Sequence, residues 1–106
     1  MSVELPGPVR AAIDAVNAND FSAFSASFTS DGVVDDWGRE FRGADIRSWS
    51  DAEFIGKNAT LAVDSVEVVG ADVTVIAQVG GDGFNGPSTF IFTVDGDLVS
   101  AMKIRA

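Results

Sequence analysis

Carboxylates supply almost all the side chains in this sequence that could do acid–base chemistry. The 106 residues contain no His, Cys or Tyr, which excludes His-based acid–base chemistry, thiol nucleophiles, disulfides and the usual zinc sites. Proton transfer by a side chain must then use Asp, Glu or Lys. The most suggestive arrangement is the pair Asp35 and Asp36, which Trp37 follows directly. This acidic pair is therefore the candidate catalytic position.

Asp35 and Asp36 lie on a predicted strand over residues 33–37, so their side chains must point to opposite faces. One of them is expected to face any pocket beneath the sheet. In an apolar cavity beside an indole, desolvation raises the pKa of a carboxylate. A raised pKa is what a base needs in order to abstract a proton next to a carbonyl. The alternative is that both lie on an exposed strand end and pair with Arg39 or Arg42 without any catalysis.

Three helices and six strands are predicted to position this pair. A helix begins at Pro8 and ends near Ala18, a second is capped by Asp20 and ends near Thr29, and a third begins within residues 43–45. The predicted strands span 33–37, 39–42, 60–69, 72–79, 88–94 and 97–104. This order, with helices first and a long antiparallel meander last, predicts an α+β fold.

Alternating apolar residues indicate that one face of the sheet is covered. Val73, Val75 and Ala77 share one face of their strand, and Phe90 and Phe92 share one face of the next. The apolar residues of the strand over 60–69 change parity midway, which predicts a bulge near Asp64 or Ser65. Because bulges curve sheets, the helices can cover a concave face, and that concavity is a natural pocket.

Composition and charge limit the partners. With 46% hydrophobic residues, eight Phe and two Trp, residues 1–106 can build the core of a single domain. The net charge of −9 has the wrong sign for a nucleic-acid or anionic membrane partner. The first residues lack a positive start and an apolar run, and no stretch is long enough to span a bilayer, so a cytoplasmic location is predicted.

Aromatic residues from several elements could line the pocket. The Gly-rich segment 80–87 could close over the pocket mouth and bring Phe84 to a ligand with Asn85 offering an amide, or be an ordinary long hairpin loop. Glu53 is a candidate for a second carboxylate in the pocket, although a capping box begun by Ser50 explains its position more simply. Lys57 is a pocket candidate of the same weight. The predicted pocket residues are Trp37, Trp49, Phe54, Phe84, Phe90 and Met102. No metal or cofactor is predicted, because the acidic pairs lack the regular spacing of a cation-binding loop.

Four motifs spread over nearly the whole chain carry a family resemblance: VNAND at 16–20, FTSDGVVDD at 28–36, FRG at 41–43 and DLVSAM at 97–102. Together they resemble the nuclear transport factor 2-like superfamily, in its SnoaL-like polyketide cyclase and ketosteroid isomerase branch. The resemblance implies a cone-like, curved, mostly antiparallel sheet, with the N-terminal helices and one mid-chain helix on its concave face. It also implies a deep apolar pocket and a homodimer formed through the sheet.

The resemblance also gives Asp36 a role, since this residue matches the isomerase general base. The family's oxyanion donors are a tyrosine in the first helix and an acid on a late strand, and the matching positions here are Ala12 and Ser88. Ketosteroid isomerisation and the family's dehydratase and epoxide hydrolase chemistries are therefore disfavoured. Of the reactions that the resemblance implies, cofactor-free cyclisation of an activated carbonyl compound, with Asp36 as the base, is the one that these residues still allow. The alternative is a noncatalytic module that binds a small, mostly apolar molecule or dimerises.

Overall fold

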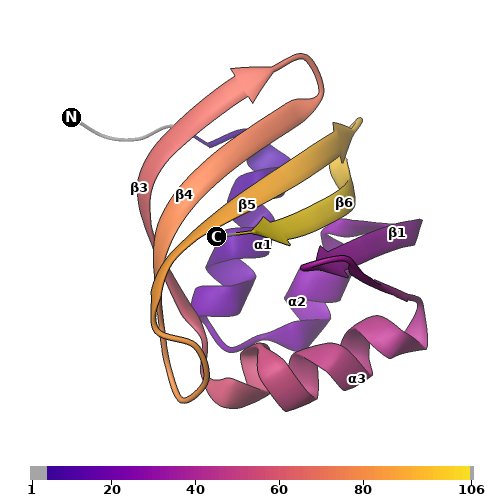
Figure 1. The fold of residues 1–106 in the computed structure, drawn as a ribbon. Coiled ribbons are helices and arrows are strands. Elements are labelled where there is room, and N and C mark those ends of the chain that lie inside the picture. Colours follow the sequence, from indigo (N-terminus) through magenta and orange to yellow (C-terminus); the bar gives the residue numbers. More distant parts are fainter. Residues whose placement is uncertain (1–4, 106) are drawn as a thin grey trace.

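The computed structural model describes residues 5–105, which form three α-helices, a 3₁₀ turn and one six-stranded sheet (Figure 1). The helical elements are α1 (Gly7–Asn17), α2 (Phe21–Ala26), α3 (Ala44–Glu53) and the 3₁₀ turn η1 (Ile55–Lys57). The strands are β1 (Phe28–Asp36), β2 (Arg39–Arg42), β3 (Thr60–Val69), β4 (Asp72–Gly80), β5 (Gly86–Asp95) and β6 (Leu98–Arg105). The predicted α+β fold is confirmed.

The sheet has the strand order β2-β1-β6-β5-β4-β3. Its neighbouring strands are antiparallel except for β1 and β6, which run parallel. The sheet is curved and open, with α1 and α2 on its concave side and α3 across one end (Figure 1). This arrangement confirms the cone-like, mostly antiparallel sheet, with helices on the concave face, that the sequence predicted.

The bulge predicted on β3 is confirmed, and it keeps Val63 and Val66 on the covered face, whereas Val68, also expected inward, is 55% exposed. Val63 pairs with Ala77, whereas Ser65 already pairs with Ile76, so one extra residue is inserted between them. The insertion reverses the parity of the residues that follow. Val63 and Val66 can therefore both pack against the core.

The boundary between α2 and β1 differs from the prediction. The helix ends at Ala26, and β1 begins at Phe28, where the prediction had helix until near Thr29 and no strand before residue 33. The physical reason is tertiary: the N–H of Val99 donates to the carbonyl of Ser27 at 2.8 Å, which starts pairing with β6 at this point. The regular Phe spacing gave no sign of that pairing.

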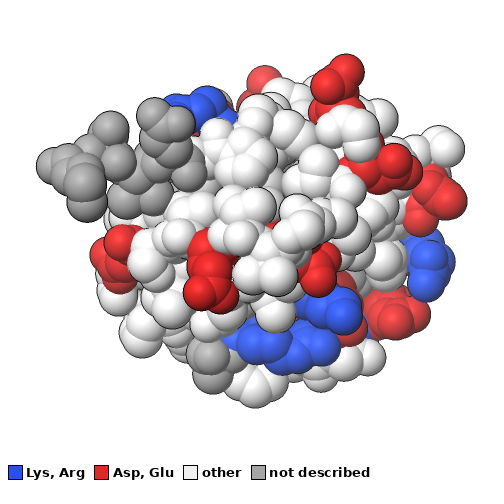
Figure 2. Space-filling model, turned by 90° about the horizontal axis from the view of Figure 1, so that it is seen from above, with Lys and Arg blue, Asp and Glu red and all other residues white. Residues whose placement is uncertain are grey.

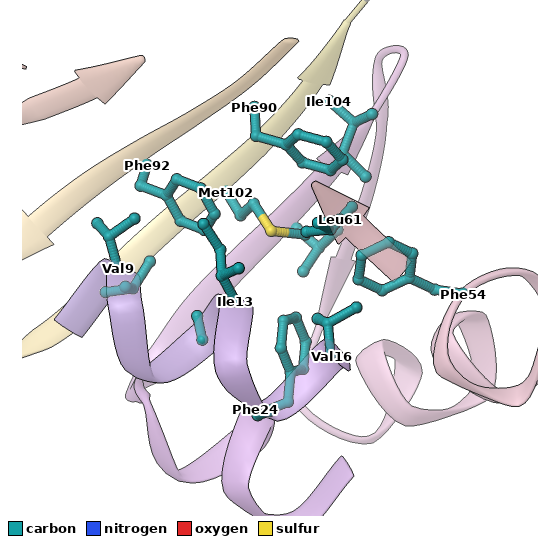
Figure 3. Close-up of a cluster of buried hydrophobic side chains, with 14 of the residues drawn as sticks. Val9, Ile13, Val16, Phe24, Phe54, Leu61, Phe90, Phe92, Met102 and Ile104 are labelled. Atoms are coloured by element: carbon teal, nitrogen blue, oxygen red, sulfur yellow. The ribbon is translucent and has the colours of Figure 1, made fainter. Parts of the chain in front are cut away.

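The core fills the space between the sheet and the helices (Figure 3). Val9 and Ile13 of α1 point towards Phe92 and Met102 of the sheet, and Val16 of the same helix, Phe24 and Phe54 belong to the same buried cluster. The alternation predicted on β4 holds, because Val73, Val75 and Ala77 are buried. Trp49 and Phe54, which were expected to face inward, are buried too.

Charged side chains stay on the surface. Figure 2 shows carboxylates spread over the face in view, with the basic side chains gathered in a few groups among them. The acidic residues of the meander, including Asp64, Glu67 and Asp72, are exposed. Within residues 5–105, no helix combines the length and the apolar character needed to cross a membrane.

Candidate functional site

A hollow of about 450 Å³ opens between α3, the turn that joins β1 to β2, and the loop between β4 and β5. Its lining is mostly apolar. The predicted site residues that it brings together are Asp36, Trp37, Trp49, Phe54, Phe84 and Phe90. These residues come from β1, α3 and β5 and from the connections that follow β1, α3 and β4, so the fold gathers them at one end of the sheet.

Met102 is the predicted pocket residue that does not line the hollow. On β6 it faces Phe92, whereas Ile104 faces Phe90 and takes part in the lining. Met102 and Ile104 share a face of the strand, but Met102 lies one residue pair farther from the open end. It is 1% exposed and belongs to the core.

The turn between β1 and β2 places Trp37 at the edge of the hollow. Trp37 and Gly38 have φ values of 55° and 90°, and Asp36 pairs with Arg39 across the turn. Two consecutive positive φ values are typical of a tight turn that continues the twist of a hairpin, but a Trp in that position costs about 1–2 kcal/mol. The indole is 62% exposed, so a strained backbone presents a large apolar side chain to solvent.

Asp36 faces the hollow and is held by two donors. Its Oδ2 accepts a hydrogen bond from Nε1 of Trp49 at 3.1 Å and forms an ion pair with Arg39. The guanidinium of Arg39 also donates through both terminal nitrogens to Glu53, at 2.8 and 3.1 Å. Arg39 therefore bridges a carboxylate of β1 and a carboxylate at the end of α3, and the hydrogen bonds that it donates, first to Glu53 and then to Asp36, raise its pKa.

Aromatic rings form a continuous wall behind this ion cluster. Arg39 lies over the ring of Phe41 at 5.5 Å, Phe41 stacks on Trp49 at 5.9 Å, and Trp49 stacks on Phe54 at 5.0 Å. Stacked rings of this kind combine apolar burial with a preferred geometry. The wall therefore fixes both Trp49 and the carboxylate that its indole binds.

Asp35 points to the opposite face, as strand alternation requires. Its carboxylate pairs with Arg105, with Nη1 to Oδ1 at 3.0 Å and Nη2 to Oδ2 at 3.2 Å, and it accepts the N–H of Gly38 at 2.7 Å. The hydrogen bond from Arg105, followed by that from Gly38, holds the pKa of Asp35 below its ordinary value of 3.8. Asp36 is thus the member of the pair that lines the hollow.

We expect Asp35→Asn to lower the free energy of unfolding at neutral pH and to flatten its dependence on pH in acid. Because the pKa of Asp35 is lowered in the folded protein, folding favours the ionised carboxylate. That stabilisation is fully present above the unfolded pKa, and it is lost as the pH falls through the lowered folded value. Urea unfolding between about pH 2 and pH 7 measures it. Asp31→Asn, at an exposed position of the same strand, is the control; an unchanged acid slope for Asp35→Asn would contradict the Arg105 pairing.

The loop between β4 and β5 is attached to η1 by polar contacts. The N–H of Asp82 donates to the carbonyl of Lys57 at 2.7 Å, and Nδ2 of Asn58 donates to Oδ2 of Asp82 at 2.7 Å. One of the two interpretations of this loop had Asn85 offering its amide to a ligand; in the structure the amide donates to the carbonyls of Gly81 and Gly83 in its own loop. Phe84 remains at the hollow and is 60% exposed.

The capping box expected at Ser50 does not form. Residues 44–53 make one uninterrupted helix, and the buried Oγ of Ser50 accepts the N–H of Ile55 at 3.4 Å, at the C-terminal side of α3. Glu53 is therefore free to bind Arg39.

Sequence reasoning missed the bridge made by Arg39. It did foresee an Arg39 pair, but only as an alternative to a pocket-facing Asp36, whereas the structure has both. The signal was the position of Arg39 directly after the Trp37–Gly38 turn, which brings it opposite Asp36.

Glu53, Lys57 and Ser88 also line the hollow. In the part of the chain that the structure describes, no three acidic side chains gather in a way that could hold a metal ion.

Several solved structures share this fold. A candidate polyketide cyclase from Sinorhizobium meliloti is 30% identical, has a TM-score of 0.82 and matches over 95% of each chain. A protein with a ketosteroid isomerase-like fold from Catenulispora acidiphila, solved in complex with trimethylamine, is 22% identical with a TM-score of 0.82, over 97% of this chain and 87% of that one. An NTF2-like protein of unknown function from Cytophaga hutchinsonii is 14% identical with a TM-score of 0.79, over 98% and 90%. No family model and no curated protein matches the sequence.

The curved sheet, with helices on its concave side and a hollow at one end, defines an α+β protein of the cone-like class. Since a relative that is 30% identical matches over nearly the whole of both chains, this chain belongs to the nuclear transport factor 2-like superfamily, in its SnoaL-like polyketide cyclase and ketosteroid isomerase-like branch. The family resemblance found in the sequence is confirmed. Membership fixes the fold and leaves the activity to the residues of the site.

Proposed function

We propose that the chain binds a small, mostly apolar molecule in the hollow. The observation that carries this proposal is the aromatic lining of a space of about 450 Å³, within the range of about 300–1,000 Å³ typical of small-molecule sites. Trp37 and Phe84 support it, because both line the hollow and stay more than half exposed. A ligand that covers these side chains would remove apolar surface from water, which is the main source of affinity for such a molecule.

Blocking the hollow tests this proposal. Ala52 is an exposed residue of α3 that lines it, so we expect Ala52→Trp to weaken binding of the uncharged dye N-phenyl-1-naphthylamine by about tenfold or more. Ala44→Trp makes the same change on an exposed part of the same helix outside the lining and should leave the affinity unchanged. Fluorescence titration measures both. Failure of the wild type to bind, or equal binding by the two variants, would refute the proposal.

A second candidate function is general-base catalysis by Asp36 on a carbonyl compound bound in the hollow. It is favoured by the position of the carboxylate in the lining and by the fact that Trp49 and Arg39 both hold Oδ2, so that neither engages Oδ1. Oδ1 would accept the proton from a C–H bond next to the carbonyl, the first step of a cofactor-free cyclisation or isomerisation. The name of the Sinorhizobium meliloti relative, a candidate polyketide cyclase, agrees with this chemistry.

Hydrogen–deuterium exchange at the acidic C–H position of small 1,3-dicarbonyl compounds, followed by NMR, separates catalysis from binding alone. General-base catalysis requires that the wild type accelerate exchange and that Asp36→Asn abolish the acceleration while dye affinity stays within about twofold. No acceleration by the wild type would support the noncatalytic alternative, a binding module on the same fold.

We also propose that a second copy of the chain covers the outer face of the sheet. The helices lie on the other face, and the register places Thr74, Ile76, Ile91 and Thr93 on this outer one. Ile76 is 41% exposed although it is a large apolar residue near the middle of β4. Light scattering should then give the mass of a dimer for the wild type and a smaller mass for Ile76→Lys. A monomeric wild type would contradict this pairing.

A further inference from the structure

The charged groups of the hollow decide which polar group a ligand may carry. Asp36, Glu53 and Lys57 are the charged residues of its lining. Arg39 forms ion pairs with both carboxylates, so both are partnered, and the three groups together carry one negative charge. Among residues 5–105, Lys57 has no ion-pair partner and is the only basic residue of the lining. Lys57 brings the sum of these four charges to zero, and among the described residues it is the one of the four without an ion-pair partner, so its ammonium is available to a negatively charged group of a ligand.

The backbone of Lys57 is fixed on both sides, which holds the start of its side chain in place. Its N–H donates to the carbonyl of Phe54 at 3.0 Å, and its carbonyl accepts the N–H of Asp82 at 2.7 Å. The first carbons of its side chain lie close to Gly83, where an added Cβ would sit 3.5 Å from Cβ and 3.7 Å from Cγ of Lys57. The stem thus packs between η1 and the β4–β5 loop, and the exposed remainder of the side chain stays adjustable.

A negatively charged ligand can approach the hollow although the whole chain carries a net charge of −9. Residues 39–57, which form β2, α3 and η1, contain as many basic as acidic side chains. Asp36, which also lines the hollow, adds one negative charge, and much of the remaining acidic excess lies on the exposed strands and turns of the meander. Exposed charges more than about 10 Å away are largely screened at ordinary ionic strength, so the local balance matters most.

We infer that the ligand of the hollow is an apolar molecule with one anionic oxygen group, a carboxylate or the enolate of a carbonyl compound, and that Lys57 binds this group. The inference rests on the proposed function, since it names the class of molecule that the hollow takes. Hydrogen bonds from an ammonium to an anionic oxygen are stronger than those between neutral groups. Arg39 is committed to two carboxylates, and Ser88 offers only a neutral hydroxyl. The apolar body of the ligand would then lie against the aromatic side chains of the lining.

Two ligands, one charged and one neutral, test this inference: 2-naphthylacetate and its neutral analogue 2-naphthylacetamide, titrated by calorimetry at neutral pH and about 0.15 M salt. We expect the wild type to bind the carboxylate about tenfold more tightly than the amide. Lys57→Met should abolish this preference and leave the amide affinity within about twofold. Lys103→Met, which removes an exposed Lys of β6 outside the lining, should retain the preference.

The outcomes are distinguishable. Lys57→Arg keeps the charge, so it should retain the preference, which separates loss of charge from a general disturbance of η1. Equal affinity of the wild type for both ligands, or an undiminished preference in Lys57→Met, would overturn the role of Lys57 while leaving dye binding in the hollow intact. If the wild type binds neither the naphthyl ligands nor the dye, the proposed function fails together with this inference.

Discussion

Phe24→Ala is expected to lower the free energy of unfolding by about 3–5 kcal/mol. Phe24 is fully buried, and its ring lies 5.0 Å from that of Phe28, 6.0 Å from that of Phe54 and 6.1 Å from that of Phe21. Truncation would leave a cavity where α2, β1 and the end of α3 meet, in addition to the lost apolar burial. Urea unfolding followed by circular dichroism measures the change.

Phe84→Ala is the matched control for this loss. It removes the same atoms, but from a ring that is 60% exposed in the loop between β4 and β5. We expect it to cost less than about 1 kcal/mol. Similar losses for the two variants would mean that Phe24 does not occupy the packed position described above.

Gly56→Ala is expected to destabilise the protein by about 3 kcal/mol or more, at or beyond the upper end of what overpacking usually costs. A Cβ on this residue would lie 1.8 Å from the carbonyl oxygen of Asp51 and 2.5 Å from its carbonyl carbon. Both atoms belong to the backbone of α3, so neither can move aside without disrupting the end of the helix. The same displacement would shift η1, and with it Lys57.

Gly7→Ala provides the comparison, since an added Cβ there meets nothing within 4 Å. Because Gly7 is the first residue of α1, Ala should be neutral or stabilise the protein by up to about 1 kcal/mol. Thermal unfolding of the two variants beside the wild type checks the pair. A Gly56→Ala protein as stable as the wild type would show that α3 and η1 do not approach as closely as described.

The parts of the fold that follow from local pattern were predictable from the sequence. Alternation of Val73, Val75 and Ala77 fixes one face of β4, and the change of parity after Val63 locates the bulge, because both depend on the two-residue period of a strand. The start of β1 was not predictable in this way. Phe28 continues the helical spacing of the residues before it, and only pairing with a strand distant in sequence places it in the sheet.

The site shows the same division. Strand alternation predicts that one of Asp35 and Asp36 faces the hollow, without saying which. Trp37 was predicted in the strand, where alternation would place it on the face opposite to Asp36, and it reaches the hollow because it lies in the turn with a positive φ. Met102 has the correct face, but the sequence does not show at which end of β6 the hollow lies. The bridge from Arg39 to Glu53 joins residues 14 positions apart through the packing of α3 against the hairpin, which no local spacing encodes.

The parallel pairing of β1 with β6 has a consequence for the order of folding. Asp35 and Arg105 meet although they are 70 positions apart, whereas β3 to β6 are joined by successive short connections. Because closing a loop of that length costs chain entropy, we expect the meander to form first and β1 to join it later. We then expect the edge of the hollow that carries Asp36 and Trp37 to assemble late, and a ligand that spans both sides to oppose its opening.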